Sequence, residues 1–208
     1  LKVMSKEVSL DELTIDKMVK SITNSHWSVS SEARETGTLV HEALEKLINA
    51  RMDSSEEPQP PIHTGARTAF NAFLAWEKEN QPEYLGSEEV IYYLDAKSGF
   101  DYTGTLDLVF RLQGNLCVGD FKTSKVFTEE MIAQVALYAT AYEQCHQEKV
   151  KQIFIFRLPK TDDGQLEIID FDFTPKWRRF CRQMNDLDHF QREIGKELRT
   201  KIKELRNG

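Results

Sequence analysis

Residues 102–125 read YTGTLDLVFRLQGNLCVGDFKTSK, and this stretch decides the fold because it predicts two neighbouring strands. The runs 102–112 and 116–121 are rich in β-branched and aromatic residues, which favour strands. The short segment QGN at 113–115 between them is typical of a tight hairpin connection. The sequence therefore predicts a β-hairpin near the middle of the chain.

Three charged residues interrupt this apolar hairpin: Asp107 in the first strand, and Asp120 and Lys122 in the second. A turn centred on Gly114 places Asp107 opposite position 121, and a shift of one residue places it opposite Asp120. Either register makes the two carboxylates neighbours, and strand alternation puts Asp120 and Lys122 on one face. Adjacent carboxylates need a positive partner. From the hairpin alone, a structural ion pair with Lys122 and a bound divalent metal both remain open.

Helical and strand patterns continue on both sides of the hairpin. We expect helices near 9–22, 35–50, 64–79 and 128–144, strands at 89–94, 153–158 and 166–173, and a last helix from Thr174-Pro175. This order predicts an α/β fold with a central mixed sheet flanked by helices. The proline-rich stretch 54–62 divides a helical N-terminal part, 1–62, from a core, 63–208, and we expect one structural domain overall.

Composition excludes several classes of protein. The 208 residues are 40% hydrophobic and 29% charged, which is enough apolar material for a core and argues against a disordered chain. A run of 18 apolar residues and a basic-then-apolar leader are both missing, so we expect neither a membrane span nor a secretory signal. Three cysteines without CxxC spacing favour a reducing compartment. We therefore expect an intracellular protein, in the cytoplasm or nucleoid, with a phage-infected cell or an organelle as further settings.

Charge is distributed unevenly along the chain. The net charge is −7, yet residues 174–208 contain ten Lys/Arg and five Asp/Glu. An acidic body with a basic C-terminal helix can bind a polyanion through that helix, and Arg178, Arg179 and Arg182 are the candidate residues. The alternative is that this helix is simply a solvated amphipathic helix.

Two predicted helices carry polar residues at suggestive spacing. Gly37 and His41 are four residues apart on the helix before the hairpin, and Gln134 and Tyr138 are four apart on the helix after it. Taken separately, a lone helical histidine is more often a packed residue, and Tyr138 could belong to the core.

Taken together, these motifs resemble the PD-(D/E)XK nuclease superfamily, and specifically its RecB-like branch. That branch has a helical GxxxH, a strand ending in GxxD, a D-x-K strand and a helical QxxxY, in that order. Here the same order is Gly37…His41, Gly104…Asp107, Asp120-Phe121-Lys122 and Gln134…Tyr138. The sequence around the D-x-K strand is most similar to that of mitochondrial genome-maintenance exonucleases and of phage and bacterial exonucleases. The similarity covers about residues 35–145 by motif, and the proline that often precedes the first aspartate is missing.

The resemblance implies a restriction-endonuclease-like fold and a metal site. Asp107, Asp120, His41 and the carbonyl of Phe121 would hold Mg²⁺ or Mn²⁺, and oxygen ligands with one imidazole suit these ions. Lys122 would complete the catalytic set with the two aspartates. The cysteine pattern of the iron–sulfur members of the branch is missing, so we expect no iron–sulfur cluster.

The resemblance also implies a substrate. Gln134 and Tyr138 would brace the site or contact DNA, and Glu35, Glu42 and Glu89 are candidates for supporting carboxylates around it. We expect a metal-dependent DNA exonuclease acting on single-stranded ends, with replication or recombination proteins as further partners. The alternatives are a structure-specific or restriction-like endonuclease and a non-catalytic nucleic-acid-binding domain of the same fold.

Overall fold

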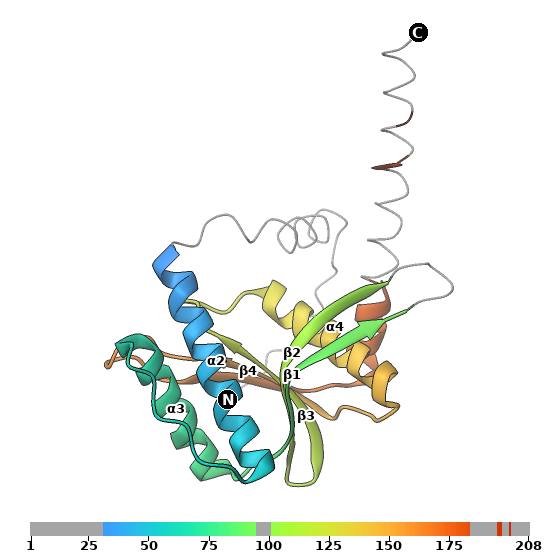
Figure 1. Cartoon of the computed structure of the whole chain (residues 1–208). Helices are drawn as coiled ribbons and strands as arrows, with labels where there is room; N and C mark the ends of the chain where they lie inside the picture. Colours follow the sequence, from blue (N-terminus) through green and yellow to red (C-terminus); the bar gives the residue numbers. More distant parts are fainter. Residues whose placement is uncertain (1–30, 95–100, 184–194, 197–199, 201–208) are drawn as a thin grey trace, which may run out of the picture.

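A computed structural model describes residues 31–94, 101–183, 195–196 and 200 of the chain. The elements in chain order are α2 (Ser31–Asp53), α3 (Thr64–Asn80), β1 (Glu83–Tyr93), β2 (Tyr102–Leu112), β3 (Asn115–Lys122), α4 (Glu129–His146), β4 (Gln152–Arg157) and β5 (Glu167–Asp172). A further helical stretch covers residues 175–183 (Figure 1).

The five strands form one mixed sheet in the order β1-β2-β3-β4-β5. Strands β3 and β4 pair in parallel, and the other three pairs are antiparallel. A parallel pair needs a long crossover connection, and α4 provides it between β3 and β4. The predicted α/β fold with a central mixed sheet and flanking helices is confirmed.

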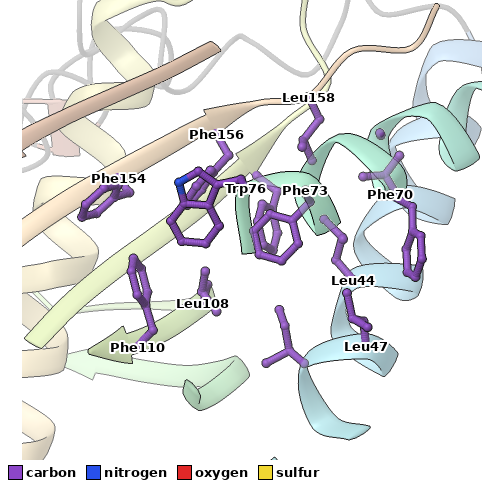
Figure 2. Packing of buried hydrophobic residues seen from close by; sticks show 14 of the residues in the cluster. Leu44, Leu47, Phe70, Phe73, Trp76, Leu108, Phe110, Phe154, Phe156 and Leu158 are labelled. Atoms are coloured by element: carbon purple, nitrogen blue, oxygen red, sulfur yellow. The ribbon is translucent and has the colours of Figure 1, made fainter. Parts of the chain in front are cut away.

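Helices cover both faces of this sheet and bury a separate hydrophobic cluster on each (Figure 1). On one face, α2 and α3 pack their apolar residues against alternate side chains of β2, β3 and β4. This cluster is rich in stacked and edge-on aromatic rings, including those of Phe73, Trp76, Phe110, Phe154 and Phe156 (Figure 2). On the other face, α4 packs alanine and valine side chains against the opposite set of strand residues.

A two-residue turn fixes the register of the central hairpin. Gln113 and Gly114 both have positive φ, 52° and 80°, which gives the backbone twist that short antiparallel hairpins favour. Leu112 then pairs with Asn115, and the pairing continues to Leu108 with Gly119. This is the second of the two expected registers, because the paired numbers add to 227 and Asp107 and Asp120 occupy corresponding positions.

Most predicted elements match the observed ones, with shifts at their ends. Strand β1 begins at Glu83 rather than at 89, because it pairs with β2 along its whole length. Thr128 is the N-cap of α4, and its side chain makes no capping hydrogen bond. The helix predicted near 9–22 and the last helix beyond residue 183 lie outside the described residues, apart from 195–196 and 200. Within the described part of the chain, no helix combines the length and apolar character needed to cross a membrane.

Candidate active site

The site begins where β2 separates from β3. The backbone pairing of these strands ends at Leu108 and Gly119, and the next residue of β2 is Asp107, which is 8% exposed. Its Oδ2 accepts a hydrogen bond from the backbone N–H of Phe121 at 2.7 Å. A side chain thus holds the two strands together where backbone pairing ends, and this fixes the carboxylate in the opening between them.

His41 reaches the same opening from α2. Its Nε2 lies 3.0 Å from the carbonyl oxygen of Phe121, and its Nδ1 lies 3.5 Å from Asp107 and 3.6 Å from Glu88. The peptide of Phe121 is therefore bracketed by Asp107 on its N–H and by His41 on its carbonyl. Burial acts to lower the pKa of His41, but the carboxylates of Asp107, Asp120 and Glu88 outweigh it and raise the pKa to about 9.

Asp120 and Lys122 lie on the face of β3 that α4 covers. The ammonium of Lys122 is 2.8 Å from Oδ2 of Asp120. That buried oxygen nevertheless accepts no hydrogen bond with acceptable geometry from the described residues. Asp120 is 3% exposed, and burial together with the charge of Asp107 raises its pKa. Burial opposes the charge on Lys122, but Asp120 and Asp107 outweigh burial and raise its pKa.

Gln134 and Tyr138 extend this polar chain along α4. Lys122 donates to Oε1 of Gln134 at 3.1 Å, and the amide of Gln134 donates to the hydroxyl of Tyr138 at 3.1 Å. Gly104 on β2 makes room for the ring, because a Cβ at that position would lie 2.6 Å from a ring carbon of Tyr138. The GxxD and QxxxY motifs are therefore packed directly against each other.

Glu88 belongs to this constellation, although the sequence pointed to Glu89. Glu88 has a positive φ of 50°, and its carboxylate points at His41. Burial and the charge of Asp107 raise its pKa. Glu89 faces the other side of β1 and pairs with His146 at the end of α4, so its expected place beside the site is wrong. From Gly86 onward, the numbers of paired residues in β1 and β2 add to 195, and this register sets Glu88 opposite Asp107. Knowledge of this register would have identified Glu88.

The structure does not bring every candidate residue to this site. Glu35 and Glu42 are exposed on α2, and no contact described for them reaches the cluster. Arg178 needs correction as a DNA-binding candidate, because its guanidinium binds Glu143 and the carbonyls of Phe173 and Val150. Arg179 and Arg182 are exposed, so their role in binding stays a prediction.

The residues present fit a divalent cation. One ligand atom from each of His41, Glu88 and Asp107 lies within 4.8 Å of the others. If the hydrogen of a neutral His41 resides on Nε2, facing the Phe121 carbonyl, then Nδ1 is free to coordinate among the carboxylates. Asp120 lies outside that group of three, and its buried Oδ2 is paired with the ammonium of Lys122 at 2.8 Å.

Comparison with known proteins agrees with this geometry. Residues 19–208 match the model of the PD-(D/E)XK nuclease superfamily, and the chain belongs to this family. It is accordingly a nuclease, its substrate class is nucleic acid, and divalent metals are the cofactors that such nucleases use.

Two solved structures are similar to this chain at low sequence identity. A Eubacterium rectale protein with a provisional exonuclease assignment has a TM-score of 0.49 and 13% identity, covering 92% of this chain and 85% of its own. An alkaline exonuclease from Laribacter hongkongensis has a TM-score of 0.42 and 13% identity, covering 88% and 91%. No curated protein matches the sequence.

Proposed function

We propose that this chain is a Mg²⁺- or Mn²⁺-dependent DNA exonuclease of the RecB-like branch that hydrolyses phosphodiester bonds from single-stranded ends. The observation that carries the proposal is the pair of buried carboxylates at the opening between β2 and β3. Asp120 is buried and paired with Lys122, while Asp107 and Glu88 gather around His41. Buried charges are costly, and three carboxylates around one lysine and one histidine leave negative charge that a divalent cation would neutralise.

The metal would be held by Asp107, Asp120 and His41, with Glu88 as a further carboxylate. The Phe121 carbonyl, expected as a ligand, faces Nε2 of His41 on the other side of the ring from Nδ1. A divalent ion there supplies charge neutralisation at a phosphate oxygen and lowers the pKa of a bound water. The protein keeps the ligands in place: the hydrogen bond from Phe121 orients Asp107, and the Phe121 carbonyl orients the His41 ring.

Lys122 has a different task in this proposal. Its ammonium is already positioned by Asp120 and by Gln134, and the raised pKa keeps it charged. A fixed positive charge next to the reacting phosphate stabilises the negative charge that develops in the transition state. Gln134 accepts from this ammonium on the side of α4, and Tyr138 accepts from Gln134. The contribution of these two residues is therefore to position Lys122 and to contact the substrate.

Action from single-stranded ends is supported by the order of the four motifs, which is that of the RecB-like exonucleases. The test is digestion of end-labelled oligonucleotides with Mg²⁺, which should release short products and stop with EDTA. A circular single strand should resist the enzyme, because an exonuclease needs an end. Cleavage of the circle would favour the structure-specific endonuclease instead. Faster cleavage of an RNA of the same sequence would mean that RNA, not DNA, is the preferred substrate.

Asp120→Asn tests the site itself. It should remove hydrolysis and metal binding while leaving the fold intact, because it relieves charge repulsion in the metal-free site. Wild-type turnover in this variant would mean that Asp120 and Lys122 form only a structural ion pair. In that case a non-catalytic nucleic-acid-binding domain would be the better description.

A further inference from the structure

A patch of apolar side chains lies exposed next to the site, on the β1–β2 hairpin. Seven large hydrophobic side chains are exposed in the described part of the chain, and three of them lie at alternate positions in and directly after β1. These are Val90, Tyr92 and Leu94, which are 71%, 51% and 55% exposed. Alternation places Val90 and Tyr92 on one face of β1, and Leu94 follows directly after the strand. We call the surface of these three residues the hairpin face.

The hairpin face leads directly into the site. Val90 pairs with Thr105 and Tyr92 with Thr103, both of which are exposed. Along the same side of the two strands, the next positions are Glu88 and Asp107, whose carboxylates meet at His41. With a rise of about 3.4 Å per residue, Tyr92 lies about 14 Å along β1 from Glu88. A strand that enters the site along this face would pass Tyr92 within a few nucleotides of the phosphate.

The opposite face of the β1–β2 hairpin packs against α4, so it is not available to a substrate. Ile91 is buried in the cluster that α4 covers, and a Cβ at Gly104 would run into Tyr138 of α4. The tyrosines Tyr93 and Tyr102 stack on each other on this covered side, with ring centres 5.1 Å apart.

The hairpin is also held rigidly at its outer edge. The side-chain amide of Gln144 on α4 accepts from the backbone N–H of Leu94 at 2.7 Å and donates to its carbonyl at 2.9 Å. Cys145 contacts the backbone N–H and carbonyl of Tyr92 in the same way. These contacts satisfy backbone groups that an edge strand would otherwise offer to another strand. The Tyr92 side chain is thus presented on a fixed backbone, and little ordering is needed for a base to stack on it.

We propose that the hairpin face is a stacking platform for unpaired bases of the strand that enters the site, with Tyr92 as its main contact. This inference rests on the proposed nuclease function and adds the route by which the substrate arrives. An exposed aromatic ring flanked by uncharged side chains suits bases, since stacking tolerates any sequence. Positions 90, 92, 94, 103 and 105 carry no acidic residue that would repel phosphates. The platform would favour unpaired strands, because bases inside a duplex are already stacked on their neighbours.

The test is the affinity of Tyr92 variants for a single-stranded oligonucleotide, measured by fluorescence anisotropy in an Asp120→Asn background so that cleavage does not interfere. Tyr92→Ala should weaken binding about 5-fold or more, as loss of one base stack does. Tyr92→Phe should restore it, because the ring alone stacks. Ile62→Ala is the matched control: Ile62 is 91% exposed between α2 and α3, and its loss should not change affinity. An iododeoxyuridine is also placed at each successive position near the end of the oligonucleotide. At one of these positions it should photocrosslink to Tyr92.

Two results would overturn the platform. Equal affinity of the Tyr92→Ala and Tyr92→Phe variants would remove stacking as the role of this ring. Unchanged DNA affinity with a lower melting temperature, or with a change in oligomeric state, would mean that protein covers the face. These failures are distinct from failure of the proposed function, which would appear as no metal-dependent release of nucleotides by the wild-type chain.

Discussion

At the scale of single residues, a Lys122 variant can distinguish stabilisation of the transition state from binding of the metal. Its Nζ lies between Asp120 and Gln134, and it is not among the residues that would ligate a cation. Lys122→Ala should lower turnover by about 10²-fold, the usual loss for one transition-state contact. Steady-state kinetics and Mn²⁺ titration check this, with exposed Lys125→Ala as the control that keeps wild-type rates. Equal losses of DNA affinity and rate would indicate a lysine that only binds phosphate.

Glu88 and Glu89 form a natural matched pair because adjacent strand residues face opposite sides. Glu88 meets His41, whereas Glu89 pairs with His146. Glu88→Gln should weaken Mn²⁺ binding by about 10-fold or more, on the scale of losses from supporting ligands. The same change should not lower the stability of the metal-free protein, since it relieves repulsion with Asp107. Calorimetric titration of Mn²⁺ into Glu88→Gln and into the control Glu89→Gln checks this. Equal affinities of the two variants would remove Glu88 from the metal site.

His41 predicts a pH dependence with a definite sign. Its folded pKa of about 9 lies above the ordinary value of 6.5, so protonation stabilises the folded, metal-free protein. This stability is fully present below about pH 6.5 and is lost as the pH rises through about 9. Thermal melts in EDTA should show that decline, and His41→Asn should flatten it.

Metal binding should follow the opposite trend over the same range. Imidazolium cannot coordinate a cation, so Mn²⁺ affinity should rise from pH 6.5 to about 9 in the wild-type chain. This window is higher than the sequence suggests, because an isolated histidine would titrate near 6.5. A pH-independent affinity would return His41 to a packing role and leave the metal to the carboxylates.

At the scale of elements, local pattern predicted the hairpin and the helices around it, because each has its own periodicity and turn residues. The sequence also left two hairpin registers open, and the positive φ of Gln113 and Gly114 selects one. Contacts between residues far apart in the sequence could not be predicted in this way. The sequence cannot show that Arg178 binds Glu143, 35 residues away, or that β1 extends back to Glu83 through pairing with β2.

The contact of β2 with α4 at Gly104 makes a stability prediction. Gly104→Ala places a Cβ 2.6 Å from the ring of Tyr138, so either the ring or the strand must move. We expect a loss of about 1–3 kcal/mol, as for other overpacked sites. Turnover should fall too, because Tyr138 holds Gln134, which holds Lys122. Adding Tyr138→Ala should remove much of the stability cost of Gly104→Ala, and a double-mutant cycle by denaturant unfolding measures this. Strict additivity would show that the two residues do not compete for space.

At the scale of the whole molecule, charge is divided between an acidic body and a basic end. The chain carries −7 overall, yet residues 174–208 carry ten basic and five acidic side chains. The acidic site repels a polyanion, so binding needs a separate source of attraction or a bound cation. The hairpin face supplies stacking but no positive charge, and the exposed arginines of the last helix therefore remain the predicted source of phosphate contacts.

Salt dependence decides whether that basic end binds DNA. On single strands each phosphate contact contributes about 0.7 to the slope of log affinity against log salt. Arg179→Ala and Arg182→Ala should each reduce the wild-type slope by about that amount, because both side chains are exposed.

Arg178 provides the control for this experiment, since its guanidinium is held by Glu143 and two backbone carbonyls. Arg178→Ala should leave the slope unchanged and lower stability instead, by about 2–3 kcal/mol for a partly exposed ion pair. Neighbouring arginines on one helix would thus separate into one that fixes the helix to α4 and two that contact the substrate. A wild-type slope near zero would show that the basic end is only a solvated surface, and that stacking and the metal alone hold the DNA.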